Sequence, residues 1–315
     1  MHYFVRRLLS TALTLVGVSI LIFVMVRLLP GNIVTIITGT EGQLNAAQRQ
    51  DLLREFGLNR PLPVQYVLWI WNMLHGNFGY SFRSGQSVAG LLFSRLPLTL
   101  ELAVLSVLVS SIFGMVFGMV ASVSRRAPVK LATQVFGLLG LSLPDFWIGV
   151  LLILFASYAF HWLPPLTFAQ LWQDPLANLQ QMILPVLALS VGLGAVTLRM
   201  TRSSMLEVLG EEFVKVGRAK GLSERAVTLR YALRNALIPI VTILGLQMGV
   251  LLGGVVIDEQ VFGLPGLGWT LLNGVYQRDY PVVQGAVMLF AVTFILVNLI
   301  VDLAYVYLDP RIRYA

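Results

Sequence analysis

The chain has 315 residues, of which 57% are hydrophobic and only 12% are charged, and its formal net charge is +7. Soluble domains usually carry about 25% charged residues, so this composition predicts an all-α, polytopic membrane protein. The absence of cysteine excludes disulfides, zinc–thiolate sites and thiol nucleophiles.

The N-terminus is expected to be a retained membrane helix rather than a signal peptide. Arg6 and Arg7 precede the apolar stretch, and no charge falls between Leu8 and Val26, which is long enough to span a bilayer. No small-residue cleavage site follows this stretch.

About six stretches are apolar and long enough to span a bilayer. They cover residues 8–29, 97–123, 131–160, 180–202, 235–257 and 282–306. The third stretch is too long for one straight crossing, and Pro144 is expected to kink it. An even number of crossings places both termini on the same side of the membrane.

The distribution of Lys and Arg predicts which side that is. Fifteen of these residues lie in 1–7, 124–130, 199–236 and 307–315, whereas the loops 161–179 and 258–281 together hold only Arg278. Positive charge marks the cytoplasmic side, so both termini are expected there. The net charge of +7 is thereby explained by membrane topology, and no nucleic-acid partner is expected.

Residues 30–96 are expected to form an amphipathic outer subdomain between the first two spanning helices. Asn45 and Gln48 match a capping box that would start a first helix, and Gly57 would end it. The chain is accordingly divided into 1–29, the outer subdomain and a permease core over 97–315.

A second amphipathic helix is expected after Pro61 and Pro63. Its apolar residues share one helical face, and Trp69 and Trp71 suit a membrane–water interface. These apolar residues are Val64, Val67, Leu68, Trp71 and Leu74. Two interpretations remain open, a lid packed on the chain's own helices and a contact with an external partner around Trp69–Tyr80.

The sequence lacks the motifs of ATP hydrolysis and of metal-dependent hydrolysis. It has no Gly-x-x-x-x-Gly-Lys-Ser/Thr loop to hold phosphates and no His-Glu-x-x-His helix. Its histidines, His2, His75 and His161, lie too far apart in sequence to suggest a metal site. We therefore expect no enzymatic activity, no metal site and no cofactor bound by this chain.

Three acidic residues fall within the predicted spans, Glu101, Asp145 and Asp302. Such groups usually face a cavity or a partner, so Glu101 and Asp145 are candidates for a translocation pathway, with structural pairing as the alternative. A stand-alone secondary transporter is the competing class. It would need a proton or ion relay and often internal repeats, and neither is evident.

The segment 203–236, between the fourth and fifth spans, is the most charged part of the chain. Its pattern predicts a short amphipathic helix, a break at Gly221, and a second helix. Phe213, Val216 and Ala219–Lys220 would share one side of the first helix. The segment is either a solvated connection or a docking site on which a soluble partner can exert force.

The same segment resembles the coupling loop of ABC-importer permeases of the dipeptide/oligopeptide/nickel family, and the B-type dipeptide permease subunit is the nearest form. The residues that carry this resemblance are Arg218-Ala219-Lys220-Gly221-Leu222 and Ala232-Leu233-Arg234-Asn235-Ala236-Leu237-Ile238-Pro239. Further matching motifs are spread over almost the whole chain. They include Leu29-Pro30-Gly31, Phe56-Gly57-Leu58, Gly76-Asn77-Phe78-Gly79, Pro265-Gly266-Leu267-Gly268, Arg278-Asp279-Tyr280-Pro281 and Asp309-Pro310-Arg311.

The resemblance implies a permease subunit that moves solute by alternating access in the bacterial inner membrane. A second, related permease subunit, two ATPase subunits that bind ATP and Mg, and an external solute-binding protein would complete the importer. The coupling residues implied are Glu212, Phe213, Lys215, Gly217, Arg218, Ala219, Lys220, Gly221 and Leu222. One departure is that Lys215-Val216-Gly217 stands where the general motif has Glu-Ala-Ala.

The substrate class expected from the resemblance is short peptides. Glutathione, nickel or a nickel chelate, and other solutes such as sugars remain alternatives, because specificity can rest in the binding protein.

Overall fold

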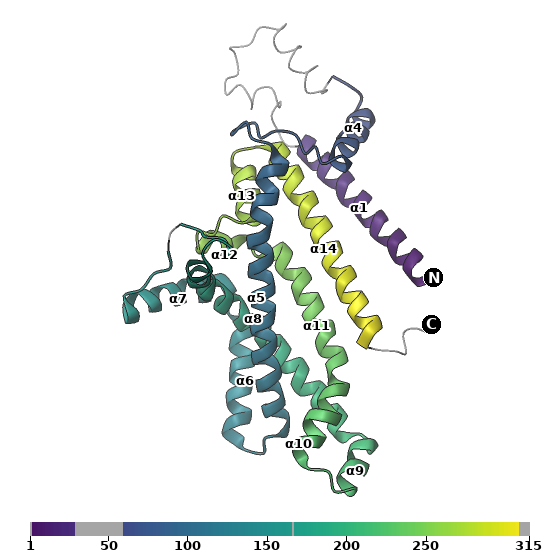
Figure 1. Cartoon of the computed structure of the whole chain (residues 1–315), viewed down its shortest axis with the longest axis vertical. Helices are drawn as coiled ribbons and strands as arrows, with labels where there is room; N and C mark the ends of the chain where they lie inside the picture. The colour runs from purple at the N-terminus through teal and green to yellow at the C-terminus, as the bar shows by residue number, and fades with distance from the viewer. Residues whose placement is uncertain (1, 29–58, 166, 309–315) are drawn as a thin grey trace. The chain divides into compact units, whose positions relative to one another are not determined.

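The computed structural model describes residues 2–28, 59–165 and 167–308, and it confirms the all-α fold class. No named strand occurs in these ranges. Figure 1 shows α1 (His2–Leu28), α4 (Leu62–Leu74), α5 (Val88–Val123), α6 (Ala127–Ser142) and α7 (Asp145–Phe160). It then shows α8 (Pro175–Gly210), α9 (Glu212–Ala219), α10 (Glu224–Ala226), α11 (Leu233–Gly254), α12 (Val256–Val261), α13 (Leu267–Tyr276) and α14 (Tyr280–Leu308). The predicted helix between Asn45 and Gly57 lies outside the described residues.

Five described helices are long and apolar enough to cross a membrane, and the number rises to six if α6 and α7 count as one bent span. The predicted bend of the third stretch at Pro144 is confirmed, and it is a full break, since α6 and α7 are separate helices whose axes differ by 107°. Leu143 and Pro144 have extended backbones between them, with ψ of 131° and 138°. A proline disfavours the helical conformation in the residue before it, so the chain turns at this point.

Two spans start earlier than hydropathy predicts. The second begins at Val88 rather than 97, so Pro97 lies inside α5. Val88 and Leu92 are fully buried, and this packing extends the helix through the polar residues around Arg95. The fourth span begins at Pro175, where the Asp174 carboxylate caps α8 by accepting bonds from two backbone amides, those of Leu176 and Ala177.

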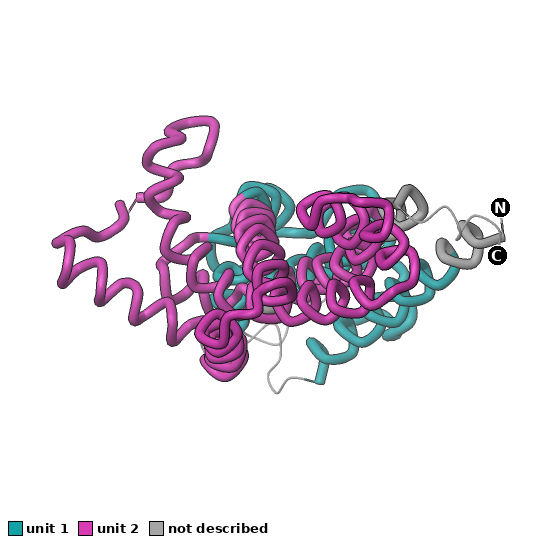
Figure 2. Tube along the Cα trace, turned by 90° about the horizontal axis from the view of Figure 1, so that it is seen from below, with its two compact units in different colours: residues 1–97, 266–295 teal, residues 98–265, 296–315 magenta. Residues whose placement is uncertain are grey.

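The chain divides into two compact units, coloured separately in Figure 2: residues 1–97 with 266–295, and residues 98–265 with 296–315. In unit 1 an apolar core joins the start of α5 to α13 and α14. Its buried members are Val88, Leu92, Leu267, Val282, Ala286 and Leu289. The Asp279 carboxylate accepts bonds from the Ser81 hydroxyl and the Phe82 amide, which ties the loop before α5 to the start of α14.

Helix α4, also in unit 1, confirms the helix predicted after Pro61. Tyr66 and Trp69 pack against Phe23 of α1, and the Tyr66 hydroxyl lies 2.8 Å from that of Ser19. The predicted apolar face is exposed, with Trp71 at 61% and Leu74 at 77%. One side of α4 is therefore fixed to α1, and its apolar side has no cover within the described chain.

Unit 2 packs α8 against α6, α7 and α11. One core cluster joins α5, α8, α11 and the residues after α12, including Leu102, Met182 and Leu252. A second cluster, of Met205, Ala232, Ala236 and Ile240, lies where α8 meets η1 (Val227–Ala232) and α11. This second cluster supports the segment with the predicted coupling residues.

Glycines allow α5 and α6 to approach α8 closely. A Cβ on Gly114 would lie 2.5 Å from the Cβ of Thr197, and one on Gly118 would lie 2.6 Å from that of Thr201. A Cβ on Gly140 of α6 would lie 2.8 Å from that of Ala195. Real Cβ atoms do not approach so closely, so glycine is required at these crossings, just as small residues are common in other membrane helix pairs.

Candidate functional site

Helix α9 lies at the end of α8 that is remote from Pro175. Helix α8 ends at Gly210, Glu211 has an extended backbone, and the chain turns directly into α9. Val214 and Gly217 are buried where α9 packs against the end of α8 and against η1. The sequence correctly predicts both this short helix and its amphipathic character.

The opposite side of α9 is open. Phe213 is 42% exposed and Val216 is 51% exposed, although both are apolar. The charged residues around them are exposed too, and Lys215 pairs with Glu212 at 3.2 Å. The open surface of α9 therefore combines two large apolar side chains with charge, as a protein-binding surface does.

A Schellman motif ends α9 at Gly221. The Gly221 amide donates to the Arg218 carbonyl at 2.9 Å, and the Leu222 amide donates to the Gly217 carbonyl at 3.3 Å. Gly221 has a φ of +81°, in the left-handed region that glycine adopts most easily. The predicted helix stop is confirmed, and the motif fixes the direction in which the chain leaves α9.

The side chain of Leu222 lies over Gly217, the glycine within the helix. Its Cδ1 atom lies 3.4 Å from where a Cβ of Gly217 would be. The leucine thus folds back over Gly217 and makes the apolar contact that commonly accompanies a Schellman motif.

An ion pair that sequence reasoning missed bridges the turn. Arg218 donates two hydrogen bonds to the Glu224 carboxylate, at 2.8 and 3.1 Å, so that α9 is joined to α10. This contact raises the pKa of Arg218 and lowers the pKa of Glu224. The six-residue spacing does not place the pair on one helical face, so only the turn geometry could have revealed it.

The chain enters the fifth span through irregular helix. Ser223 caps α10 by accepting from the Ala226 amide at 3.3 Å, and η1 follows as a π-helical turn before α11. π-Helical turns often occur at functional sites. Ala232 at the end of η1 is fully buried against the end of α8, so α9, η1 and α11 form one packed group.

The two predicted pathway acids are not brought together by a hydrogen bond or ion pair in the described structure. Glu101 of α5 accepts a hydrogen bond from the Asn178 amide at 3.2 Å, while its other oxygen is buried without a partner among the described residues. Asp145 is exposed at the start of α7 and accepts from the Phe146 amide.

A third acid, which the sequence reasoning did not single out, is Asp258 of α12. It is 1% exposed, and neither of its carboxylate oxygens has a hydrogen-bond partner among the described residues. Burial raises its pKa to about 7, and the negative charge of Asp145 acts in the same direction. The adjacent Glu259 is also buried, but it accepts a hydrogen bond from Thr99 at 2.6 Å.

Comparison with known families identifies the chain. Residues 114–314 match the model of the "Binding-protein-dependent transport system inner membrane component", and residues 1–103 match the N-terminal model of such membrane components. The chain belongs to this family. It is the permease subunit of an ABC importer.

Relatives match the permease over nearly its whole length. A probable peptide ABC transporter permease, y4tP of Sinorhizobium fredii, is 40% identical, with 99% of each chain covered. The glutathione transport system permease GsiC of Escherichia coli K12 is 42% identical, over 100% of this chain and 99% of the relative. The names of these relatives, a peptide permease and a glutathione permease, agree with the resemblance found in the sequence.

Two solved structures share the fold at lower identity. An amino acid ABC transporter, solved with histidines, has a TM-score of 0.54 and 18% identity, over 69% of this chain and 93% of its own. The MetNI methionine ABC transporter has a TM-score of 0.52 and 20% identity, over 67% of this chain and 93% of its own. These likenesses support the fold of the permease.

Proposed function

We propose that this permease forms the membrane pathway with a second permease subunit and is driven by ATPase subunits that dock on α9. The observation that carries this proposal is the open surface of α9, where Phe213 and Val216 are exposed on a helix that is capped and buried on its other side. Exposed apolar side chains on an otherwise well-packed helix favour a protein partner.

The connections of α9 explain how movement of a partner would reach the membrane. One end of α9 follows α8 directly, and its buried side contacts η1, which leads into α11. A displacement of α9 is therefore transmitted to two spanning helices at once. ATP and Mg are bound by the ATPase subunits, since this sequence has no phosphate-binding loop.

The membrane orientation belongs to the same proposal. Residues 203–236 and both termini lie in the cytoplasm, where the inner-face cations are expected. Residues 30–96 lie outside, with a solute-binding protein near Trp69–Tyr80. The exposed apolar side of α4 supports this arrangement, because it offers a surface beside the membrane that no described part of the chain covers.

The cargo we propose is a short peptide, with glutathione included in that class. The relatives named for peptide and glutathione transport support it. Glu101 and Asp145 supply negative charge that suits the ammonium group of a peptide. Both belong to unit 2, on α5 and at the start of α7.

The coupling role of α9 can be tested by Gly221→Val in the complete transporter. A β-branched residue resists the left-handed conformation at a cost of about 1–2 kcal/mol, so the Schellman turn should open and misplace α9. Substrate-stimulated ATPase activity and peptide uptake are measured in proteoliposomes, and a pull-down measures retention of the ATPase subunits. We expect uptake to become uncoupled from ATP hydrolysis, or the ATPase subunits to be lost.

The chain provides a matched control in Gly210→Val. Neither Gly210 nor Gly221 has an atom within 4 Å of an added Cβ, but only Gly221 has a positive φ. Gly210→Val should therefore keep coupling, and Gly221→Asn should keep most of it, because asparagine tolerates this conformation. Normal stimulated hydrolysis and uptake in Gly221→Val, at wild-type subunit levels, would show that α9 is only a solvated connection.

A further inference from the structure

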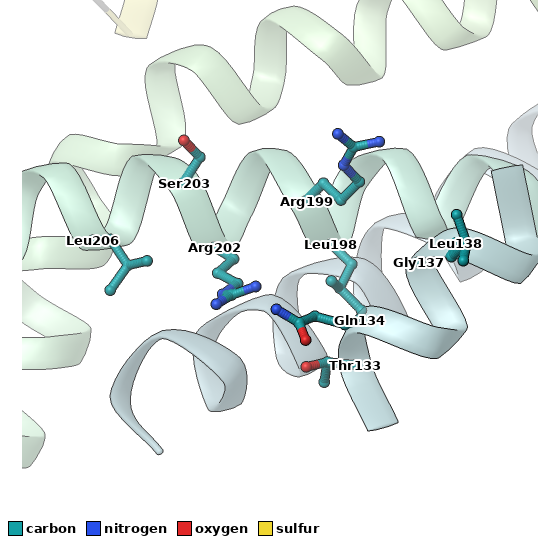
Figure 3. Close-up of a pocket in the computed structure, with 9 residues that line it drawn as sticks. All are labelled: Thr133, Gln134, Gly137, Leu138, Leu198, Arg199, Arg202, Ser203 and Leu206. Atoms are coloured by element: carbon teal, nitrogen blue, oxygen red, sulfur yellow. The ribbon is translucent and has the colours of Figure 1, made fainter. Parts of the chain in front are cut away.

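A pocket of about 450 Å³ lies between α6 and α8, apart from the open surface of α9. Figure 3 shows Arg202 of α8 and Gln134 of α6 extending toward each other across it. Apolar walls come from Leu138, Leu198 and Leu206. Its volume is in the range of small-molecule sites. One wall is α8, which is long and apolar enough to cross a membrane, and the other is α6, which meets this test together with α7.

The charge of this pocket is unbalanced. Two arginines, Arg199 and Arg202, line it, and none of its described lining residues is acidic. The Nε atom of Arg202 is buried and has no hydrogen-bond partner in the described structure. A buried guanidinium nitrogen without a partner in such a helix is costly, so an anion that fills the pocket would be bound favourably.

The polar donors and the apolar walls together specify the kind of anion. Arg202 and the Gln134 amide can donate hydrogen bonds, whereas the Thr133 hydroxyl already donates to its own helix. Leu138 and Leu206 are 67% and 48% exposed at the rim, where acyl chains would lie. A phosphate attached to acyl chains matches both the polar donors and the apolar rim of the pocket. A soluble anion matches only the donors.

The position of Arg202 along α8 also fits an anionic lipid headgroup. Arg202 lies eight residues before Gly210, which is about 12 Å along a helix with a rise of 1.5 Å per residue. This places the guanidinium near the end of the span that continues into α9. In the orientation proposed above, that end faces the inner leaflet, where anionic lipids bind basic pockets between helices.

We propose that the pocket between α6 and α8 binds the phosphate headgroup of an anionic phospholipid, with Arg202 as the charged ligand and Gln134 as a neutral donor. The bound lipid would bridge two helices close to the point where α8 passes into α9. The permease would then depend on anionic lipid for the placement of its cytoplasmic segment.

The test uses the transporter purified with its partner subunits in a neutral detergent. Native mass spectrometry measures retention of dioleoyl phosphatidylglycerol against dioleoyl phosphatidylcholine. We expect the anionic lipid to be preferred, and Arg202→Gln to lower its apparent affinity about fivefold. Gly137→Leu, which fills the pocket without changing charge, should lower binding as well.

Two controls separate this site from other sources of binding. Arg225→Gln removes a cation from the same side of the molecule, outside the pocket, and should leave the affinity unchanged. Inorganic phosphate should compete poorly. The assignment is overturned if the two lipids bind equally, if Arg225→Gln weakens binding as much as Arg202→Gln, or if phosphate displaces the lipid at comparable concentration. It is also overturned if the complex retains no lipid, since the second permease subunit would then cover the pocket.

Discussion

At the scale of single residues, three acids of unit 2 differ in their hydrogen-bond partners. Glu259 accepts a hydrogen bond from Thr99 and Glu101 accepts one from Asn178, whereas Asp258 has no partner among the described residues. A buried carboxylate without partners is costly when it is charged, which is why its pKa rises. The protonation state of Asp258 therefore makes stability depend on pH.

Asp258→Asn should stabilise the permease at pH 8, and it should do so to a smaller extent at pH 5. The pKa of Asp258 rises from its ordinary 3.8 to about 7 on folding, so the folded state holds a proton that the unfolded chain releases. Stability is consequently lost as the pH rises from about 4 to 7, and the amide abolishes this loss. We expect a gain of about 1–3 kcal/mol at pH 8. Thermal unfolding of the original chain and the variant, in detergent at both pH values, measures this gain in stability.

The control for this prediction is Asp279→Asn, because Asp279 accepts hydrogen bonds from Ser81 and Phe82. That variant should lower the melting temperature at both pH values, since a buried hydrogen-bonded network is broken. If Asp258→Asn were equally stabilising at pH 5 and pH 8, titration of Asp258 would not be the cause.

Single residues were predictable from sequence where local conformation decides their role. Gly221 could be identified as a helix stop, because glycine after an amphipathic helix has a specific backbone meaning. Asp258 could not be recognised, because an acid beyond the end of an apolar stretch looks solvated until packing buries it. The pairing of Arg218 with Glu224 depends on the turn between them, which no periodicity encodes.

At the scale of elements, hydropathy located the spanning segments because lipid requires long apolar helices. It could not place the ends of α5 and α8, which extend through polar residues that tertiary packing or a cap makes helical. It also missed η1, since a π-helical turn leaves no apolar pattern of its own. The break at Pro144 was predictable in position, but its angle of 107° depends on what the two helices contact.

The contact between α5 and α8 gives the prediction at this scale. Gly118→Ala should destabilise unit 2 by about 1–3 kcal/mol, because the new Cβ would lie 2.6 Å from Thr201 and 2.8 Å from the Leu198 carbonyl oxygen. Gly17→Ala is the matched control, as nothing lies within 4 Å of that position. Thermal unfolding in detergent compares the two.

A compensating change distinguishes steric overlap from other causes. Thr201→Gly removes the side chain that the new methyl group meets, so the double variant should recover part of the loss, with the Leu198 carbonyl still in the way. If Gly118→Ala has no effect, the helices can separate without cost and the close packing is not required.

At the scale of the whole molecule, the orientation in the membrane is the property to test. Because the chain has no cysteine, a single introduced thiol reports one position without background. Ser84→Cys should react with a membrane-impermeant maleimide in intact spheroplasts, and Ser223→Cys should react only after permeabilisation. Both side chains are exposed, so a difference in labelling reflects the side of the membrane. The reverse pattern would contradict the proposed orientation.

The glycine contacts of α8 also limit the movements available during a transport cycle. Between Ala195 and Thr201, α8 meets Gly140 of α6 on one side and Gly114 and Gly118 of α5 on the other, at backbone distance. Interlocked backbones hinder one helix from sliding along or rolling over its neighbours. A force applied at α9 should therefore displace α5, α6 and this part of α8 as a single rigid body. The conformational freedom needed for alternating access must then lie at the margins of that body, for example at the irregular turn of η1 and at the break between α6 and α7.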